Sequence, residues 1–268
     1  MADYIKGVDV SEIQRNNINW QQVANLDIKF GIAKCYQGND GRDPCYSTNI
    51  AGMKAAGILP LAYHFVYPLN TDPVHPHRDP VSQAQLHFAA AEGVRACCDL
   101  EWPTENDWNA WGINAEFINQ WCLAYLAEYS RLDGRPMIIY TYPDFAKVVK
   151  LSAEYAQYPL WIASYEATPE VPAPWTDWVI WQNSGGTDFH LPNGCPCDTD
   201  LAKDLSLWGT TATPPIVVEP VEPIIVEPTQ PTPVATQIVP PAVAQPSQLK
   251  TVLASILKIV MELLERKI

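Results

Sequence analysis

The stretch TNIAGMKAAGILPLAYHFVY, residues 48–67, contains two different patterns in direct succession. Its first half, 48–57, has a helical pattern that closes on Gly57, a residue suited to the end of a helix. Its second half, 58–67, is almost continuously apolar, which is typical of a strand buried on both faces. A helix that leads directly into such a strand predicts a mainly parallel α/β sheet.

The same alternation extends over residues 1–209. About eight strands in about 210 residues predict a sheet that closes into a barrel. Because helical patterns become rare after residue 150, we expect an irregular (β/α) barrel with fewer helices than strands, and a surface loop at Thr168–Thr176. The other predicted helices span 18–26, 79–93 and 113–134, and the other predicted strands are KGVDVS (6–11), FGIAKCY (30–36), RACCDLEW (95–102), MIIYTY (137–142), LWIASY (160–165) and WVIWQ (178–182), with a last strand near CDTDL (197–201).

The composition excludes one class of partner. The chain has a formal net charge of −13, and most of the excess acid lies in residues 1–209. Since binding to phosphates needs clustered Lys and Arg, we expect no nucleic-acid partner. The 10 Trp and 12 Tyr indicate a folded core, but their flat faces also suit sugars, and both explanations stay open.

The composition changes at Thr210. Ten prolines lie between Pro214 and Pro246, with no glycine or aromatic residue, which predicts an extended, semi-rigid spacer. The last stretch regains a helical period with a seam typical of a short coiled coil, so we expect it to self-associate; contact with a membrane surface is the alternative. The chain thus divides into a catalytic barrel (1–209), a Pro-rich linker (210–246) and an amphipathic C-terminal helix (247–268).

The cysteines and the N-terminal sequence indicate the cellular compartment in which the chain is made. The seven cysteines are an odd number, and the adjacent Cys97 and Cys98 lie in an apolar stretch, as reduced core residues do. The N-terminus MADYIKGVDV lacks the apolar segment of a secretory signal. We therefore expect synthesis in a reducing cytoplasm. Cys195 and Cys197 lack the paired spacing of zinc sites, so no metal site is expected there.

Two carboxylates lie at the end of one apolar strand. Asp99 and Glu101 are two residues apart in RACCDLEW, so on a strand both point to one face, and parallel barrels place their active sites at this end. Asp9 ends the first strand and Asp198 lies near the last, and these strands are neighbours if the barrel closes. Four acids at one mouth can have separated proton affinities, as glycoside hydrolysis requires.

Eight motifs in order resemble one known family. They are GVDVSEIQRNNINW (7–20), FGIAKCYQGNDGRDPCYSTNIAGMKAAGI (30–58), LAYHF (61–65), CDLEW (98–102), PMIIYTY (136–142), PLWIASY (159–165), WVIWQ (178–182) and CDTDL (197–201). Together they resemble glycoside hydrolase family 25, the lysozymes common among bacteriophage endolysins, over about residues 4–208. The resemblance implies a flattened β/α barrel that cleaves the β-1,4 bond between N-acetylmuramic acid and N-acetylglucosamine of peptidoglycan, without a metal or an organic cofactor.

The resemblance also implies roles for individual residues. Glu101 is expected to be the proton donor, and Asp99 to orient the substrate's N-acetyl group or to stabilise developing positive charge. Asp9 and Asp198 are expected in the same groove, which would be lined by Lys34, Tyr63, Tyr140, Trp161 and Gln182. His64 is expected to be a hydrogen-bonded barrel residue. The sequence departs from the family where Gln37 replaces a usual Glu, which puts a local salt link in doubt.

Two alternative functions and the biological setting stay open. The chain could be a catalytically inactive peptidoglycan-binding or virion module, although all four acids are present. It could also be a chitinase-like glycosidase. Its biological setting could be host lysis after release from the cytoplasm, or wall penetration by a virion-associated protein.

Overall fold

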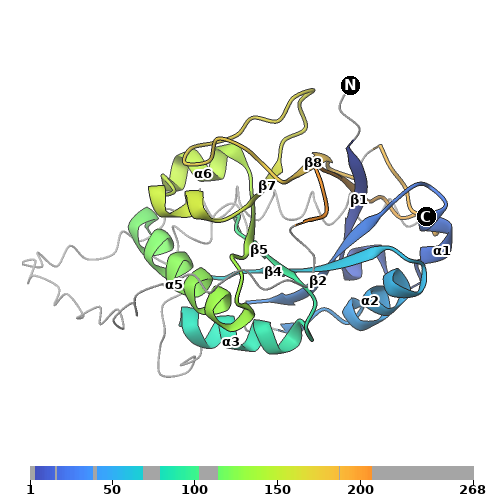
Figure 1. Cartoon of the computed structure of the whole chain (residues 1–268), viewed down its shortest axis with the longest axis horizontal. Coiled ribbons are helices and arrows are strands. Elements are labelled where there is room, and N and C mark those ends of the chain that lie inside the picture. Colours follow the sequence, from blue (N-terminus) through green and yellow to red (C-terminus); the bar gives the residue numbers. More distant parts are fainter. Residues whose placement is uncertain are drawn as a thin grey trace, which may run out of the picture. The chain divides into compact units, whose positions relative to one another are not determined.

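The computed structural model describes residues 4–15, 17–38, 41–68, 79–102, 114–186 and 188–206. Nine strands in this part of the chain form one sheet, and eight of them close a barrel in the order β1-β2-β4-β5-β6-β7-β8-β9 (Figure 1). The strands are β1 (Ile5–Val10), β2 (Phe30–Gln37), β3 (Gly41–Arg42), β4 (Leu59–Phe65), β5 (Ala96–Asp99), β6 (Ile138–Thr141), β7 (Leu160–Ala163), β8 (Ile180–Ser184) and β9 (Asp198–Ala202). The α/β barrel predicted from the sequence is confirmed.

The barrel is parallel except at one strand. Parallel pairs run from β1 through β8, whereas β9 is antiparallel to both β8 and β1. The short β3 is attached outside the closed ring, paired only with β2. Because β9 runs the opposite way, its first residues lie at the same mouth as the carboxyl ends of the other seven barrel strands.

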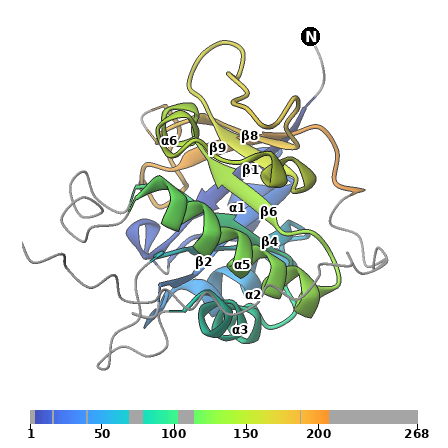
Figure 2. The ribbon, with the colours of Figure 1, turned by 90° about the vertical axis from the view of Figure 1, so that its left-hand side faces the viewer.

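The helices lie outside the strands. They are α1 (Trp20–Ala24), α2 (Tyr46–Ala55), α3 (Pro80–Ala90), α5 (Ala115–Asp133) and α6 (Pro143–Val149), with 3₁₀ turns at Glu12–Gln14 and Ala153–Gln157. Figure 2 shows α5 across the near side, with α3 and α2 below it. In the described part there are fewer helices than barrel strands, as predicted; α6 was not predicted.

Local sequence signals explain where the helices begin and end. Asp79 caps α3 by accepting a hydrogen bond from Ser82 N, and Pro80 takes the first helical position. Asn114 caps α5 in the same way, through Phe117 N. Gly134 ends α5 in the left-handed region at φ 72°, where a side chain would add strain. The predicted boundaries at 79 and 134 are therefore set by these residues.

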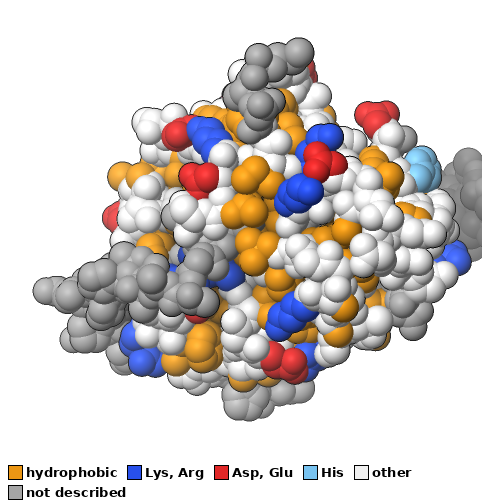
Figure 3. Space-filling model, turned by 45° about the vertical axis from the view of Figure 1, so that its right-hand side comes forward, with side chains coloured by type: hydrophobic (Ala, Val, Ile, Leu, Met, Phe, Trp, Pro, Cys, Tyr) orange, Lys and Arg blue, Asp and Glu red, His pale blue; other side chains and the backbone are white. Residues whose placement is uncertain are grey.

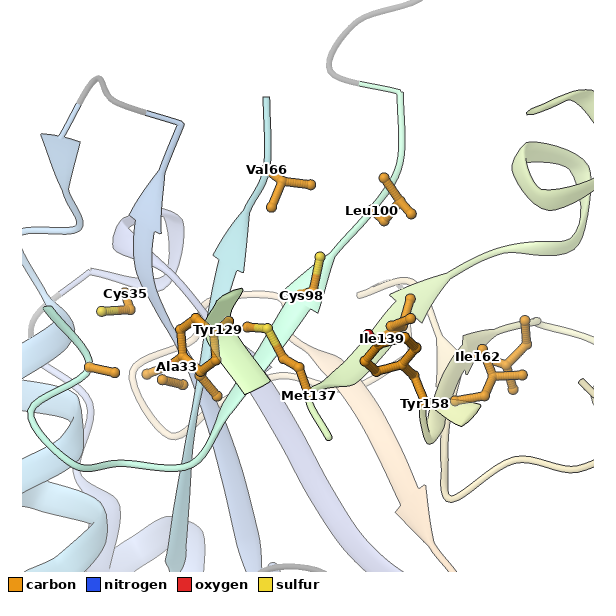
Figure 4. Packing of buried hydrophobic residues seen from close by; sticks show 14 of the residues in the cluster. Ala33, Cys35, Val66, Cys98, Leu100, Tyr129, Met137, Ile139, Tyr158 and Ile162 are labelled. Atoms are coloured by element: carbon orange, nitrogen blue, oxygen red, sulfur yellow. The ribbon is translucent and has the colours of Figure 1, made fainter. Parts of the chain in front are cut away.

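Two buried layers lie on either side of the strands, because successive side chains point to opposite faces. The outer layer, under the helices, holds Cys98, Ile139 and Ile162 from three adjacent strands together with Tyr129 of α5 (Figure 4). The interior of the barrel is filled by Phe30, Ile32, Leu61, Cys97, Ile138, Tyr140, Trp161, Ala163, Ile180 and Ala202. This packed interior supports the mouth from below.

Two further predictions, a surface loop and reduced cysteines, can be compared with the structure. Thr168–Thr176 is irregular, as expected, although Trp175 within it is buried and donates a hydrogen bond to the carbonyl of Tyr158. All seven cysteines are free thiols, and Cys97 and Cys98 are fully buried. The proposed linker and C-terminal helix, 210–268, lie outside the described residues.

Acid does not dominate the face drawn in Figure 3. Basic and acidic side chains lie there among hydrophobic and neutral ones. No helix in the described ranges is long and apolar enough to cross a membrane.

Candidate active site

The first and last strands bring two aspartates side by side. Asp9 near the end of β1 and Asp198 at the start of β9 are direct partners in the antiparallel register. Opposite residues in such a pair have Cα atoms roughly 4.5–5.5 Å apart. The reversed direction of β9 therefore produces the convergence expected from the sequence.

Asp99 and Glu101 reach the same mouth from β5. Cys98 and Leu100 pack in the outer layer, so the alternation turns Cys97, Asp99 and Glu101 to the inside. The strand ends at Asp99 rather than running to residue 102 as predicted. Leu100 N still donates a 3.0 Å hydrogen bond to the carbonyl of Tyr140, which keeps the chain extended for one more residue. Glu101 thus lies just above the strand end, more open to solvent than Asp99.

Gln182 connects the aspartates to the aromatic wall. Its Oε1 accepts hydrogen bonds from the hydroxyls of Tyr140 and Tyr165, both at 3.0 Å. These two donors orient the amide so that Nε2 donates to Asp9 Oδ2 at 2.8 Å and lies 3.5 Å from Asp198 Oδ2. Asp9 is therefore held by a buried, fully hydrogen-bonded amide.

Burial sets the proton affinity of Glu101 and Asp9. Burial raises the pKa of Glu101 to about 7; Lys34 lowers it in part and Asp198 adds to the rise. Burial and the charge of Asp198 raise the pKa of Asp9 to about 7 as well, against the hydrogen bond from Gln182. A carboxylic acid that keeps its proton up to neutral pH is suited to general acid catalysis.

The pKa values of the other two predicted acids are raised as well. Asp99 is 5% exposed, and burial followed by the charge of Glu101 raises its pKa well above the usual range. Burial raises the pKa of Asp198 too. Because neighbouring carboxylates oppose each other's ionisation, the four predicted acids titrate as a group.

Lys34 is the cation that acts on Glu101 and Asp99. Its Nζ donates a hydrogen bond to Gln37 Oε1 and lies 5.5 Å from the centre of the Phe65 ring. Gln37 in turn donates to the hydroxyl of Tyr67 at 2.9 Å. The local salt link put in doubt by the sequence is therefore replaced by a hydrogen bond from Lys34 to an uncharged amide.

The predicted aromatic residues on the inner wall differ in how far they are buried. Tyr140 and Trp161 are both buried and are direct partners in the sheet register, with the Trp161 ring edge-on to Tyr140 at 4.6 Å and to Tyr63 at 6.3 Å. Trp161 Nε1 donates to Asp200 Oδ1 at 2.9 Å. Trp161 thus packs and orients other residues, whereas Tyr63 is half-buried.

Two residues at this mouth were missed. Tyr165 follows β7 and is 60% exposed although its hydroxyl bonds to Gln182, so its ring forms part of the rim. Asp200 lies beneath Asp198 on the same side of β9 and is 1% exposed. The signal for Asp200 was present, because Asp198-Thr199-Asp200 repeats the two-residue spacing of Asp99 and Glu101.

His64 lies away from these acids. It alternates with Tyr63 and Phe65 on β4, is buried, and stacks against Tyr125 of α5. Burial lowers its pKa to about 3, so it is neutral. The expectation of a barrel residue is confirmed, but the expected hydrogen bonds are not: both ring nitrogens are buried without a partner.

The arrangement can donate and accept protons. Within the residues that the structure covers, no His, Cys, Asp and Glu side chains form a group of three or more that could hold a metal ion. The chemistry these residues offer is that of a buried acid beside further carboxylates and hydrogen-bond donors.

Comparisons with known proteins match this geometry. The sequence profile of "Glycosyl hydrolases family 25" matches residues 8–189. Lysozyme M1 of Streptomyces globisporus is 26% identical over 78% of this chain and 72% of its own length, and the N,O-diacetylmuramidase of Arthroderma benhamiae is 23% identical over 72% and 84%. The solved structure of a muramidase from Trichobolus zukalii is 26% identical, with a TM-score of 0.60 over 73% of this chain and 92% of that one. This chain belongs to glycosyl hydrolases family 25.

Proposed function

We propose that this glycoside hydrolase is a muramidase that cleaves the β-1,4 bond between N-acetylmuramic acid and N-acetylglucosamine in peptidoglycan. The observation that carries the proposal is Glu101 at the mouth of a family 25 barrel, with burial raising its pKa to about 7. The names of its relatives, a lysozyme and muramidases, support the same substrate.

Glu101 is proposed as the general acid. In its protonated form it donates the proton to the glycosidic oxygen as the bond from that oxygen to the anomeric carbon breaks. The leaving sugar keeps the electron pair and the proton as a hydroxyl group. A water molecule then adds to the anomeric carbon and returns a proton to Glu101, which restores the acid.

Asp99 is proposed to orient the acetamido group of the substrate or to stabilise developing positive charge. The orienting role needs only a hydrogen bond, so it is compatible with the raised pKa of this buried side chain. An acetamido oxygen that attacks the anomeric carbon would replace a protein nucleophile, as in the exceptional families of the general scheme. Two carboxylates on one strand therefore do not decide the stereochemical course.

Asp9 and Asp198 are proposed to line the groove and to stabilise the positive charge that develops in the transition state. Gln182 holds Asp9 in place, and Tyr140 and Tyr165 hold Gln182. Lys34 and Tyr63 are proposed to line the same groove, with Trp161 behind them.

The remaining parts of the chain are proposed from their sequence alone. Residues 1–209 form the catalytic part, 210–246 a Pro-rich spacer and 247–268 a helix that self-associates or contacts a membrane surface. Such a tail fits wall cleavage during phage-mediated lysis or entry, by an enzyme made in the cytoplasm or carried on a virion. Light scattering of the full chain and of a 1–209 truncation tests self-association, which is refuted if both are monomers.

The test of the proposed function is mass spectrometry of soluble fragments released from purified peptidoglycan. The wild type is expected to release fragments with muramic acid at the reducing end, and Glu101→Gln is expected to release almost none. Glu166→Gln, which removes the same charge from an exposed side chain, is the matched control and should cleave like the wild type.

Other outcomes separate the alternatives. Glucosamine at the reducing end would retain a hydrolase but overturn the bond assignment. Cleavage of chitin in place of peptidoglycan would favour the chitinase-like alternative. A folded wild type that binds peptidoglycan without cutting it would point to a binding module.

A further inference from the structure

Asp200 is an acid buried below the site, on the same side of β9 as Asp198. It pairs with Gly7 of β1 and with Gln182 of β8 in the sheet register. A step of two residues along a strand is roughly 6.5–7 Å, so Asp200 lies about that much deeper than Asp198. At 1% exposed it is out of reach of bulk water.

Only one of the two carboxyl oxygens of Asp200 accepts a hydrogen bond. Oδ1 accepts the 2.9 Å hydrogen bond from Trp161 Nε1. Oδ2 is buried and no hydrogen-bond donor reaches it, but the carboxyl groups of Asp200 and Asp9 are in hydrogen-bond contact with each other. No salt bridge reaches Asp200 in the described part of the chain, so a negative charge there would be buried without a counter-ion, which is costly.

The titratable groups that act electrostatically on Asp200 make its ionisation less favourable still. Burial is the main cause that raises its pKa well above the usual range, and Asp9 is the next, followed further down by Asp198. The others near it are thiols and a phenol, on β5, before β9 and after β7: Cys97, Cys197 and Tyr165. None of these groups carries a positive charge.

We propose that Asp200 is a positioning residue that stays protonated and donates a hydrogen bond from its carboxyl group to Asp9. Asp9 then lies between two donors, Gln182 Nε2 from one side and the Asp200 hydroxyl from below. Both bonds favour the ionised form of Asp9. These two donors favour loss of a proton from Asp9 before Glu101, so that Glu101 keeps the proton that it donates.

The proposal deepens the proposed function, and its first test does not depend on activity. Infrared difference spectra of the full-length wild type minus Asp200→Asn at about pH 8.5, where an ordinary Asp is fully ionised, should show a carboxylic acid carbonyl band from the protonated Asp200. Asp204→Asn, the same change on an exposed side chain just after β9, is the control and should show no such band. A carboxylate band in place of the acid band would overturn the proposal even if the chain had no muramidase activity.

The second test is the pH profile of kcat/KM for peptidoglycan cleavage. Asn keeps an acceptor for Trp161 and a donor for Asp9, so Asp200→Asn should keep activity to within a few fold and leave the acid limb in place. Asp200→Leu removes the donor, so the pKa of Asp9 should rise and the acid limb should move to higher pH, with kcat lowered roughly 10- to 100-fold. If Asp200 were ionised, both variants would remove a negative charge next to Asp9. The pKa of Asp9 would then fall, and the acid limb of the kcat/KM profile would move to lower pH instead.

A separate control checks that each variant is folded. Near-ultraviolet circular dichroism of each variant identifies one that has lost its packed core, and the infrared comparison with Asn, the nearest isostere, does not rely on Leu. An unshifted acid limb in a folded Asp200→Leu variant would refute the positioning role.

Discussion

Replacing Glu101 by Gln should abolish cleavage and, at alkaline pH, stabilise the fold. The side chain has an ordinary pKa of 4.5, which burial raises to about 7. An acid whose pKa is raised on folding binds its proton more tightly in the folded state. Its favourable contribution is therefore complete below about pH 4.5 and is lost as the pH rises through about 7.

The size of the effect follows from the same two values. A rise from 4.5 to about 7 corresponds to about 3 kcal/mol between the two protonation states. Solvent that reaches the mouth screens part of this cost, so we expect about 2 kcal/mol of extra stability for Glu101→Gln at about pH 9. In a barrel of about 200 residues this is a rise in Tm of roughly 4–8 °C, and at about pH 4 the variant and the wild type should agree.

Thermal unfolding followed by circular dichroism from about pH 4 to about pH 9 measures this difference, with Glu166→Gln as the exposed control. The reasoning is refuted if the change in Tm for Glu101→Gln is the same at both ends of the range, or if the variant is less stable than the wild type at about pH 9. Either result would mean that Glu101 is not forced to ionise in an unfavourable environment.

Three further outcomes are expected. Cleavage activity should fall as the pH rises through about 7, because burial holds the pKa of Glu101 there and the acid is then lost; the pH profile of kcat/KM checks this. Gln182→Leu should lower kcat by roughly 10- to 100-fold, since Asp9 loses its 2.8 Å donor, while KM changes less; steady-state turbidity assays with a folding control measure both. Gly186→Ala should lower stability by about 1–2 kcal/mol in urea unfolding, because φ is 77° and the new Cβ would lie 2.9 Å from Asp198 Oδ1.

Sequence patterns predicted the elements of this fold better than the details at their ends. Residues such as Asp79 and Gly134 fix helix boundaries through local hydrogen bonds and backbone conformation, so a local pattern is sufficient there. The end of β5 depends instead on how far Tyr140 and its neighbours on β6 extend beside it, which no local pattern records. Helix α6 escaped notice because it is short and follows Tyr142 without a side-chain cap.

Prediction of the site from the sequence was limited in the same way, because local patterns do not record contacts between distant strands. Asp9, Asp99 and Asp198 could be assigned to one mouth because each lies at the end of a recognisable strand. The function of Gln182 as the link between Asp9 and two tyrosines depends on contacts between strands distant in sequence. The spacing of Asp198 and Asp200 is visible in the sequence, but the depth of Asp200 depends on the direction of β9.

Two acids spaced two residues apart occur at the mouth on both β5 and β9, and the direction of each strand decides which of the two is buried. On β5, which runs toward the mouth, Asp99 is buried and Glu101, two residues later, is more open to solvent. On β9, which runs away from the mouth, Asp198 is half-buried and Asp200, two residues later, is sealed inside. An acid that must exchange its proton with substrate and water in each cycle needs the outward position, whereas a proton that only orients a neighbour is best kept where water cannot remove it. The single antiparallel strand therefore does more than close the barrel: it supplies a second pair of carboxyl groups whose inner member retains its proton.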